Sequence, residues 1–427
     1  MVVLLLPVSC GGKQGDSNEW GGILAPIAEH VAAAHLDDAR GETAARQCQA
    51  SDCTYATAYP KQYVAYKTSA LGPDTLDGDL SKTVWAEVPW TEDFVDISTT
   101  TIPKFRTRAK IRWDDGFLYV AAELQEPDVW ATLTEHDSVI FHDNDFEVFV
   151  DANATTHYYK EFEMNALDTT WDLSLNKPYG DGGFENSSRV FGAHGWDMQP
   201  PLRSAVAISP TGVINDPSTP NSQWSVEIAL PLRELAYNST LNMPVHGTFW
   251  RIDFSRVQWN VLVDATSNTY TKQPACQSCP SPGAPKEDNW VWSPQGEIAM
   301  HLPERWGILQ FSTEAANETA ASYYAEWPSR SAAMAIYYAN HAYKKEHGSF
   351  TSSLRELLPY SAAPFEICDC AETKIEIGEA GASFRATVTT PTGAGAAYAA
   401  TVRNDRFLTV AAGGSGVKPG PAGSRSL

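Results

Sequence analysis

Short runs of alternating apolar and polar residues recur between residues 59 and 313, and this alternation constrains the fold more than any other feature of the sequence. The most regular run is Phe105–Trp113, which the turn residues Asp114–Gly116 connect to a second run, Phe117–Leu124. Because successive side chains of a β-strand point to opposite faces, this pattern predicts a β-hairpin with one face in a core. Many such runs with few helical segments predict a mainly β protein, an antiparallel β-sandwich of the jelly-roll or immunoglobulin-like type.

Changes in composition divide the chain into four parts. Residues 1–58 begin with a signal-like apolar stretch and continue with an Ala-rich segment that we expect to be helical, and residues 59–313 would form the sandwich. Residues 314–412 contain a helical pattern at Ser329–His347 followed by short apolar runs, which predicts a small α+β domain. Residues 413–427 are rich in Gly, Pro and Ser and are expected to form a disordered tail.

The run from Phe141 to Asp151 is the candidate centre of function. Three apolar side chains would face the core, namely Phe146, Val148 and Val150. The opposite face would carry Asp145, Glu147 and Asp151, with Phe149 among them. If the next run, Tyr158–Leu167, forms a hairpin with this strand, Glu147 would lie near Glu161 and Asp145 near Glu163. Like charges directly opposite in a sheet repel each other, so these carboxylates need a compensating group.

Three kinds of compensation are compatible with the sequence. The acids could form ion pairs with the basic face of the first hairpin, which consists of Arg106, Arg108, Lys110 and Arg112. They could lie next to a calcium ion, because Asp143, Asn144 and Asp145 supply the oxygen ligands that calcium prefers. They could instead accept hydrogen bonds from the hydroxyl groups of a ligand, in which case the acids would line an open hollow with aromatic walls.

Composition narrows the classes of partner. The 427 residues carry a net charge of −21 and no run rich in Lys or Arg, which argues against a nucleic-acid partner. No apolar run reaches the length of a membrane-spanning helix. An acidic chain with 14 Trp suits neutral ligands such as sugars, because aromatic rings pack on apolar C–H groups.

Three sequence features favour export. Met1–Cys10 resembles the apolar part of a signal peptide. Glycosylation sequons occur at Asn153, Asn186, Asn238 and Asn317. Six of the seven cysteines fall in close pairs that suggest disulfides, namely Cys48/Cys53, Cys276/Cys279 and Cys368/Cys370, with zinc binding at Cys276/Cys279 as the alternative. We therefore expect a secreted or extracytoplasmic glycoprotein.

The motifs of common enzymes are missing from the sequence. No nucleophile elbow, phosphate-binding glycine loop or His-Glu-x-x-His motif occurs, which favours a binding protein. Glycoside hydrolases use paired carboxylates, so a glycoside hydrolase is one alternative function. A haem-binding redox module is another, because His142 and Met164 are conceivable haem ligands. Five tryptophans lie in loops or at strand ends, and we expect at least one to form an exposed platform for a sugar. They are Trp130, Trp171, Trp259, Trp290 and Trp292.

Five ordered motifs between Tyr59 and Ser312 resemble the family 9 carbohydrate-binding modules and the larger family-9-like proteins built on them. The motifs are Asp77-Gly78 with Trp85, Ala109–Asp115 with Leu118–Val120, Asp145–Asp151, Trp224–Pro231, and Trp292–Pro294 with Trp306–Phe311. The resemblance implies a β-sandwich that binds poly- or oligosaccharide, structural calcium, and a role beside glycoside hydrolases in carbohydrate catabolism.

The resemblance also implies where a sugar would bind. In the family two tryptophans clamp the sugar, and Phe141 and Met300–His301 stand at those positions here, with Glu147 and Asn165 at the positions of polar partners. The predicted ligand-binding residues are Phe141, Glu147, Asn165, Trp171, Trp292, Met300 and His301, and the predicted calcium ligands are Asp143, Asn144 and Asp145. The sequence thus predicts an exported, non-catalytic carbohydrate-binding protein.

Overall fold

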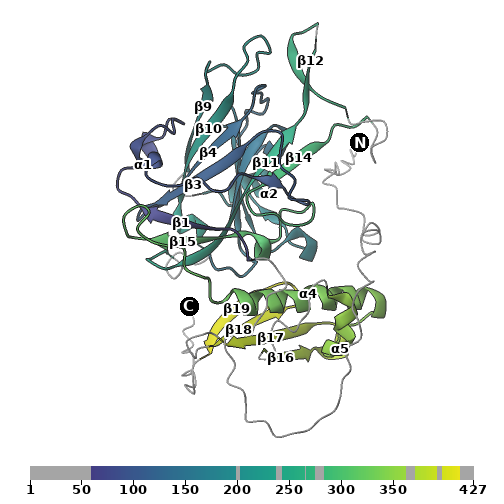
Figure 1. The fold of residues 1–427 in the computed structure, drawn as a ribbon. Coiled ribbons are helices and arrows are strands. Elements are labelled where there is room, and N and C mark those ends of the chain that lie inside the picture. The colour runs from purple at the N-terminus through teal and green to yellow at the C-terminus, as the bar shows by residue number, and fades with distance from the viewer. Residues whose placement is uncertain are drawn as a thin grey trace, which may run out of the picture. The chain divides into compact units, whose positions relative to one another are not determined.

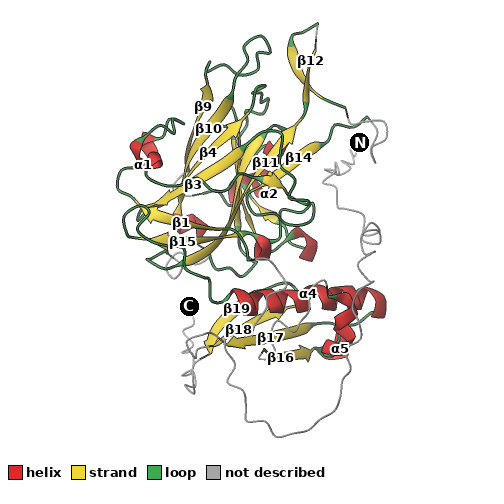
Figure 2. Cartoon of the chain, viewed as in Figure 1, coloured by secondary structure: helices red, strands yellow, loops and turns green. Residues whose placement is uncertain are grey.

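The computed structural model describes most of the chain after residue 58. The described residues are 59–198, 202–236, 243–264, 266–274, 283–361, 371–391 and 397–413. They form mainly strands, with few helices (Figure 2). The predictions for residues 1–58, for all seven cysteines, for the sequon at Asn238 and for the tail after residue 413 lie outside the described residues.

Within the described residues, 13 strands form one large sheet. Its strands are β1 (Gln62–Lys67), β2 (Val95–Asp96), β3 (Thr107–Trp113), β4 (Phe117–Gln125), β5 (Asp145–Asp151), β6 (Lys160–Asn165), β7 (Thr170–Leu175), β8 (Glu185–Asn186), β9 (Arg203–Ser209), β10 (Gln223–Pro231), β11 (Phe249–Trp259), β14 (Glu287–Val291) and β15 (Gly307–Ser312). Their order is β8-β7-β6-β5-β11-β15-β1-β3-β4-β10-β9, while β14 pairs with β11 and with β2. Figure 1 labels the part of this sheet from β15 to β9.

Short elements connect these strands. The helices are α1 (Thr83–Ala86), α2 (Ser188–Phe191) and α3 (Leu232–Leu235), and a separate hairpin is formed by β12 (Val261–Asp264) and β13 (Thr269–Lys272). The 3-10 turns are η3 (Pro73–Thr75), η4 (Ile140–His142), η5 (Tyr179–Asp181), η6 (Gly192–His194) and η7 (Pro303–Arg305). Of these, η4 and η5 border the candidate site.

The large sheet curls so that its two halves enclose one core. Ile111 of β3 and Val120 of β4 belong to the same buried cluster as Phe146 of β5 and Phe254 of β11. A sheet that buries one face against itself is a sandwich, so the predicted β-sandwich is confirmed. The sheet is mixed, however, because β1 runs parallel to both β15 and β3.

The first predicted hairpin is confirmed, but its basic face does not neutralise the acidic strand. Strand β3 pairs with β4 and β1 and is not a neighbour of β5. The partners of its basic side chains are Glu123 for Arg106 and Arg108, Glu87 for Arg112, and the carbonyl oxygen of Trp85 for Lys110. The predicted ion pairing between these residues and Asp145 or Glu147 is therefore wrong.

The C-terminal part is the predicted α+β arrangement. Its elements are α4 (Trp327–His347), α5 (Leu354–Leu357), η8 (Leu358–Tyr360), η9 (Glu379–Gly381), β16 (Glu372–Ile377), β17 (Phe384–Pro391), β18 (Ala397–Arg403) and β19 (Leu408–Gly413). Helix α4 packs against β17 and β18 of the antiparallel sheet β16-β17-β18-β19 (Figure 1). Its C-cap residue is Gly348, whose φ of 80° is the left-handed conformation that glycine favours. No helix in the described part of the chain is long and apolar enough to span a bilayer.

Buried ion pairs connect this part to the loops of the sandwich. Arg406 is 6% exposed and contacts Asp181 of η5 at 2.6 Å and Glu304 of η7 at 2.7 Å. In addition, Nη1 of Arg330 in α4 donates to the carbonyl oxygen of Ala154 at 2.5 Å. The ion pair between Arg406 and Asp181 holds η5, which carries Tyr179.

Candidate functional site

The acidic face of β5 and β6 exists, with a register two residues away from the predicted one. Glu147 lies opposite Glu163, and Asp145 lies opposite Asn165. The connection between the strands is longer than the predicted hairpin because the carboxylate of Asp151 accepts hydrogen bonds from several backbone N–H groups, including that of Thr156 at 2.6 Å. This loop moves the pairing partner of Glu147 from Glu161 to Glu163.

The acids are buried, so the predicted open hollow above them is wrong. Asp145 is 0% exposed, Glu163 1%, and Glu147 and Glu161 are each 5% exposed. The apolar face was predicted correctly, since Phe146, Val148 and Val150 lie in the sandwich core. The carboxylates thus lie on the outer face of the sheet, beneath other side chains.

Three of these carboxylates converge closely enough to share one cation. Asp145, Glu147 and Glu163 each offer an oxygen, and these oxygens all lie within 4.8 Å of one another. Oδ1 of Asp145 accepts from the backbone N–H of Val257 at 2.8 Å, whereas Oδ2 has no hydrogen-bond partner. A buried carboxylate oxygen without a partner is costly, so a proton or a cation must compensate for it.

Burial changes the protonation of the whole group. Desolvation raises the pKa of Glu147 to about 7, and the neighbouring side chains of Ser255 and Asp145 limit that rise. Burial, followed by the charge of Glu147, raises the pKa values of Asp145, Glu161 and Glu163 well above their ordinary range. At neutral pH the cluster therefore holds protons unless a cation replaces them.

Two members of the predicted calcium triplet form hydrogen bonds within the protein. The carboxylate of Asp143 accepts from the backbone N–H groups of Thr132 and Leu133, the Thr132 hydroxyl and the Asn165 amide. The Asn144 amide bonds to Trp259 and to Glu126. Because both side chains are already engaged within the protein, Asp145 is the member of the triplet that fits a cation, together with Glu147 and Glu163.

An aromatic layer lies beside and above the acids. Trp171 on β7 stands opposite Glu163 and is 5% exposed, while Phe141 and Tyr179 are 37% and 43% exposed. The ring of Phe141 lies 6.4 Å from that of Trp171, and its backbone N–H donates to Oε2 of Glu163 at 3.1 Å. The exposed surface next to the buried acids is therefore aromatic.

Two polar side chains belong to the same layer. The ring of His301 lies 4.6 Å from that of Tyr179, its Nδ1 lies 2.9 Å from the Tyr159 hydroxyl, and burial lowers its pKa to about 4. The guanidinium of Arg189 lies 5.1 Å from the Trp171 ring and pairs with Glu185. The sequence did not single out Tyr179 or Arg189, although the turn-rich stretch Pro178–Gly183 around Tyr179 indicates an exposed loop.

Of the other predicted ligand-binding residues, Trp292 and Asn165 are buried and Met300 is partly buried. Trp292 is 0% exposed in the sandwich core, with its ring 5.9 Å from that of Phe254, so it does not join the aromatic layer. Asn165 is 0% exposed, and its amide donates to the Leu133 carbonyl at 2.9 Å. Met300 packs against the buried cluster that contains Tyr159 and Trp306, and its carbonyl oxygen accepts from the Trp306 indole.

The expectation of an exposed tryptophan platform is also wrong. Among the five tryptophans predicted for this role, exposure is 8% at most, at Trp259. Trp171, Trp259 and Trp290 lie on β7, β11 and β14, and the large rings of all five tryptophans are stabilised by burial. The haem ligand pair does not form either, since Met164 is 0% exposed in the core whereas His142 is exposed on η4.

Comparison with known proteins identifies the type of domain. Residues 76–192, which include β5, β6 and β7, match the family described as carbohydrate family 9 binding domain-like. The resemblance drawn from the sequence is thereby confirmed over this part of the chain. No curated protein matches the chain.

Two solved structures are similar to the chain at low identity. One is a family 9 carbohydrate-binding module from Caldicellulosiruptor kristjanssonii in complex with cellotriose, with 14% identity, a TM-score of 0.37, and coverage of 62% of this chain and 100% of that one. The other is a family 9 module from the same organism in complex with glucose, with 15% identity, a TM-score of 0.37, and coverage of 61% and 100%. At such low TM-scores neither structure locates a binding site on this chain.

Proposed function

We propose that the chain is a non-catalytic carbohydrate-binding protein whose sugar site lies on the outer face of β5, β6 and β7. The observation that carries this proposal is the exposure of the Phe141 and Tyr179 rings, 37% and 43%, beside the buried acids. An exposed aromatic ring offers the apolar C–H face of a sugar a surface to stack on. The family match supports carbohydrate as the class of ligand.

Polar groups beside the two rings would orient the sugar. The Tyr179 hydroxyl can donate and accept hydrogen bonds, and the neutral ring of His301, with 25% of its side chain exposed, lies against the Tyr179 ring. The acids beneath act on the ligand through their charge and through the side chains that they position, because Glu147 and Glu163 are themselves buried. The proposed ligand-contacting residues are therefore Phe141, Tyr179 and His301.

The proposal includes a structural cation, for which calcium is the class that the ligands favour. Asp145, Glu147 and Glu163 would hold it, since calcium prefers carboxylate oxygens and Oδ2 of Asp145 has no other partner. The ion would supply the positive charge that the buried carboxylates need, because without it they must stay protonated. Fixed carboxylates in turn position Phe141, whose backbone N–H bonds to Glu163.

The geometry favours binding over glycoside hydrolysis. Glycosidases place two carboxyl groups about 5 to 10 Å apart across a cleft that the substrate enters. Here the converging oxygens lie within 4.8 Å of one another, and their residues are at most 5% exposed. Turnover of aryl glycosides that disappears in Glu147→Gln would support the hydrolase alternative instead.

We further propose that the protein acts outside the cytoplasm and assists glycoside hydrolases in carbohydrate catabolism. The family match and the signal-like stretch at Met1–Cys10 support this role. Secretion of the full chain by an expressing cell would test the first part of this proposal. An increase in polysaccharide hydrolysis when the protein is added to a hydrolase would test the second.

The central test is direct binding. We expect the full chain to bind at least one poly- or oligosaccharide on a glycan array, and isothermal titration to show at least a tenfold weaker Kd for Phe141→Ala and Tyr179→Ala. The matched control is Tyr323→Ala, which removes a tyrosine that is 54% exposed elsewhere on the protein and should leave the Kd unchanged. Absence of binding to every glycan, with and without calcium, would refute the proposal.

A further inference from the structure

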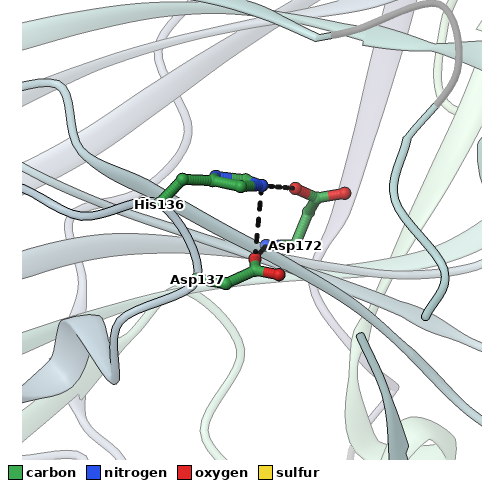
Figure 3. A group of neighbouring side chains, drawn as sticks. All are labelled: His136, Asp137 and Asp172. Carbon is green, nitrogen blue, oxygen red and sulfur yellow. Dashed lines mark hydrogen bonds and ion pairs between the residues drawn. The ribbon is translucent and has the colours of Figure 1, made fainter. Parts of the chain in front are cut away.

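A second group of metal-ligand side chains lies on the edge of the sandwich, separate from the acid cluster. His136 and Asp137 come from the loop between β4 and η4, and Asp172 comes from β7. Figure 3 shows the three side chains pointing toward one another, with the His136 ring directed at both carboxylates. The carboxylate of Asp197 approaches the same nitrogen from the segment after η6.

Hydrogen bonds from the surrounding protein orient the two carboxylates, so that one oxygen of each faces the His136 ring. Oδ2 of Asp172 accepts from the backbone N–H of Met198 at 2.8 Å, and the carboxylate of Asp137 accepts from the Ser188 hydroxyl. Oδ1 of Asp172, in contrast, has no hydrogen-bond partner, although Asp172 is only 1% exposed. A buried carboxylate oxygen without a hydrogen-bond partner, directed at an imidazole, favours a positive charge between the two groups.

The histidine is oriented from its other side. Nδ1 of His136 lies 3.1 Å from the Thr170 hydroxyl oxygen. When Nδ1 donates its proton to Thr170, Nε2 presents a lone pair toward the carboxylates. Such a hydrogen bond to the outer ring nitrogen is the usual way in which proteins orient a metal-binding histidine.

The distances match a bound ion better than direct hydrogen bonds. Nε2 of His136 lies 3.4 Å from Asp137 Oδ1, 3.6 Å from Asp172 Oδ1 and 3.7 Å from Asp197 Oδ1. Nitrogen–oxygen hydrogen bonds are about 2.7 to 3.2 Å long. Zinc–ligand bonds of about 2.0 to 2.2 Å at tetrahedral angles place two ligand atoms about 3.4 Å apart, which is close to the observed separations.

We propose that His136, Asp137 and Asp172, with Asp197 as the fourth group, form a binding site for a divalent transition-metal ion of the zinc class. An imidazole nitrogen favours such an ion over calcium, which takes oxygen ligands. The ion would connect the loop before η4, strand β7 and the segment after η6.

The test uses the untagged full chain, stripped with chelator and then titrated with zinc. We expect one equivalent to bind, the melting temperature to rise, and the Kd to weaken at least tenfold in His136→Ala and Asp172→Asn. His136 has 46% of its side chain exposed, so its removal should not unfold the protein. The matched control, His246→Ala, removes another exposed histidine and should keep the affinity.

Two further measurements separate this site from other zinc ligands. Cobalt bound by nitrogen and oxygen gives no thiolate charge-transfer absorption, so metal on the cysteines would be recognised by its spectrum. Glu163→Gln, which alters the acid cluster, should leave zinc affinity unchanged. Zinc affinity that is unaffected by His136→Ala and Asp172→Asn would overturn the proposal, as would no zinc binding at all, which would indicate a protonated His136 paired with the carboxylates.

Discussion

Glu147 of β5 stands directly opposite Glu163 of β6, so two buried carboxylates of like charge form one cross-strand pair. The basic residues of β3 are engaged with Glu123, Glu87 and a backbone carbonyl, and cannot compensate for this pair. The stability of the folded protein should therefore depend on whether protons or a cation compensate for these carboxylates, and this dependence can be measured.

Removing one charge from the pair should stabilise the protein when divalent cations are absent. Because the pKa of Glu147 is raised to about 7, its ionised form is disfavoured in the folded state. Glu147→Gln should increase the free energy of unfolding by about 2 to 3 kcal/mol at pH 8 in chelator, as measured by urea denaturation. Glu372→Gln, which removes an exposed acid from β16, should change it by less than about 0.5 kcal/mol. A lower free energy of unfolding in Glu147→Gln would contradict the repulsion between the Glu147 and Glu163 carboxylates.

The stability of the cation-free protein should fall as pH rises from about 4.5 to 7. A carboxylate whose pKa is raised on folding contributes stability below its unfolded pKa and loses it as pH rises through the folded value, which is about 7 for Glu147. Calcium should cancel this loss, because the ion binds the deprotonated form. Melting temperatures at pH 5 to 8, with calcium and with chelator, measure both effects. Identical curves would mean that protons alone compensate for the cluster.

Gly307 should tolerate no side chain, because Trp292 occupies the space where one would be. A Cβ atom at Gly307 would lie 2.2 Å from Cζ3 of the Trp292 ring. Gly307→Ala should therefore lower the free energy of unfolding by about 1 to 3 kcal/mol. Gly72→Ala is the matched control, since a Cβ there meets nothing within 4 Å. A neutral Gly307→Ala would mean that Trp292 is packed less tightly than the structure indicates.

Arg406 should be essential for stability, whereas the nearby Arg403 should not. Arg406 is 6% exposed and pairs with Asp181 and Glu304, so its removal leaves buried carboxylates without a counter-charge. Arg406→Ala should cost about 3 to 5 kcal/mol in chemical denaturation. Arg403→Ala breaks a partly exposed pair with Asp405 and should cost less than about 1 kcal/mol. Equal effects would contradict this difference in burial.

The sequence predicted the strands and the faces of the sandwich well, because alternation is a local property. Phe146 and Val148 point to the core as their spacing requires. The register was missed because it depends on the loop that Asp151 organises, in which Ala154, Thr156 and Tyr158 have positive φ. Such a loop leaves no periodic signal.

The candidate sites were less predictable, because they depend on contacts between distant residues. His136 lies before η4 and Asp172 on β7, so β5 and β6 separate these two neighbours along the chain. The burial of Trp292 depends on the close approach of Gly307. Neither contact can be derived from the spacing of residue types along the chain.

The parallel placement of β1 between β15 and β3 has a consequence for how the protein is made. Until residue 312 has left the ribosome, β1 lacks one of its two flanking strands, so the sandwich cannot close during most of its synthesis. A recombinant fragment limited to residues 76–192 would lack β1, β11 and β15. Strand β5 would then have an unpaired edge, because β11 is its neighbour in the sheet. Expression boundaries should therefore enclose residues 59–312 at least.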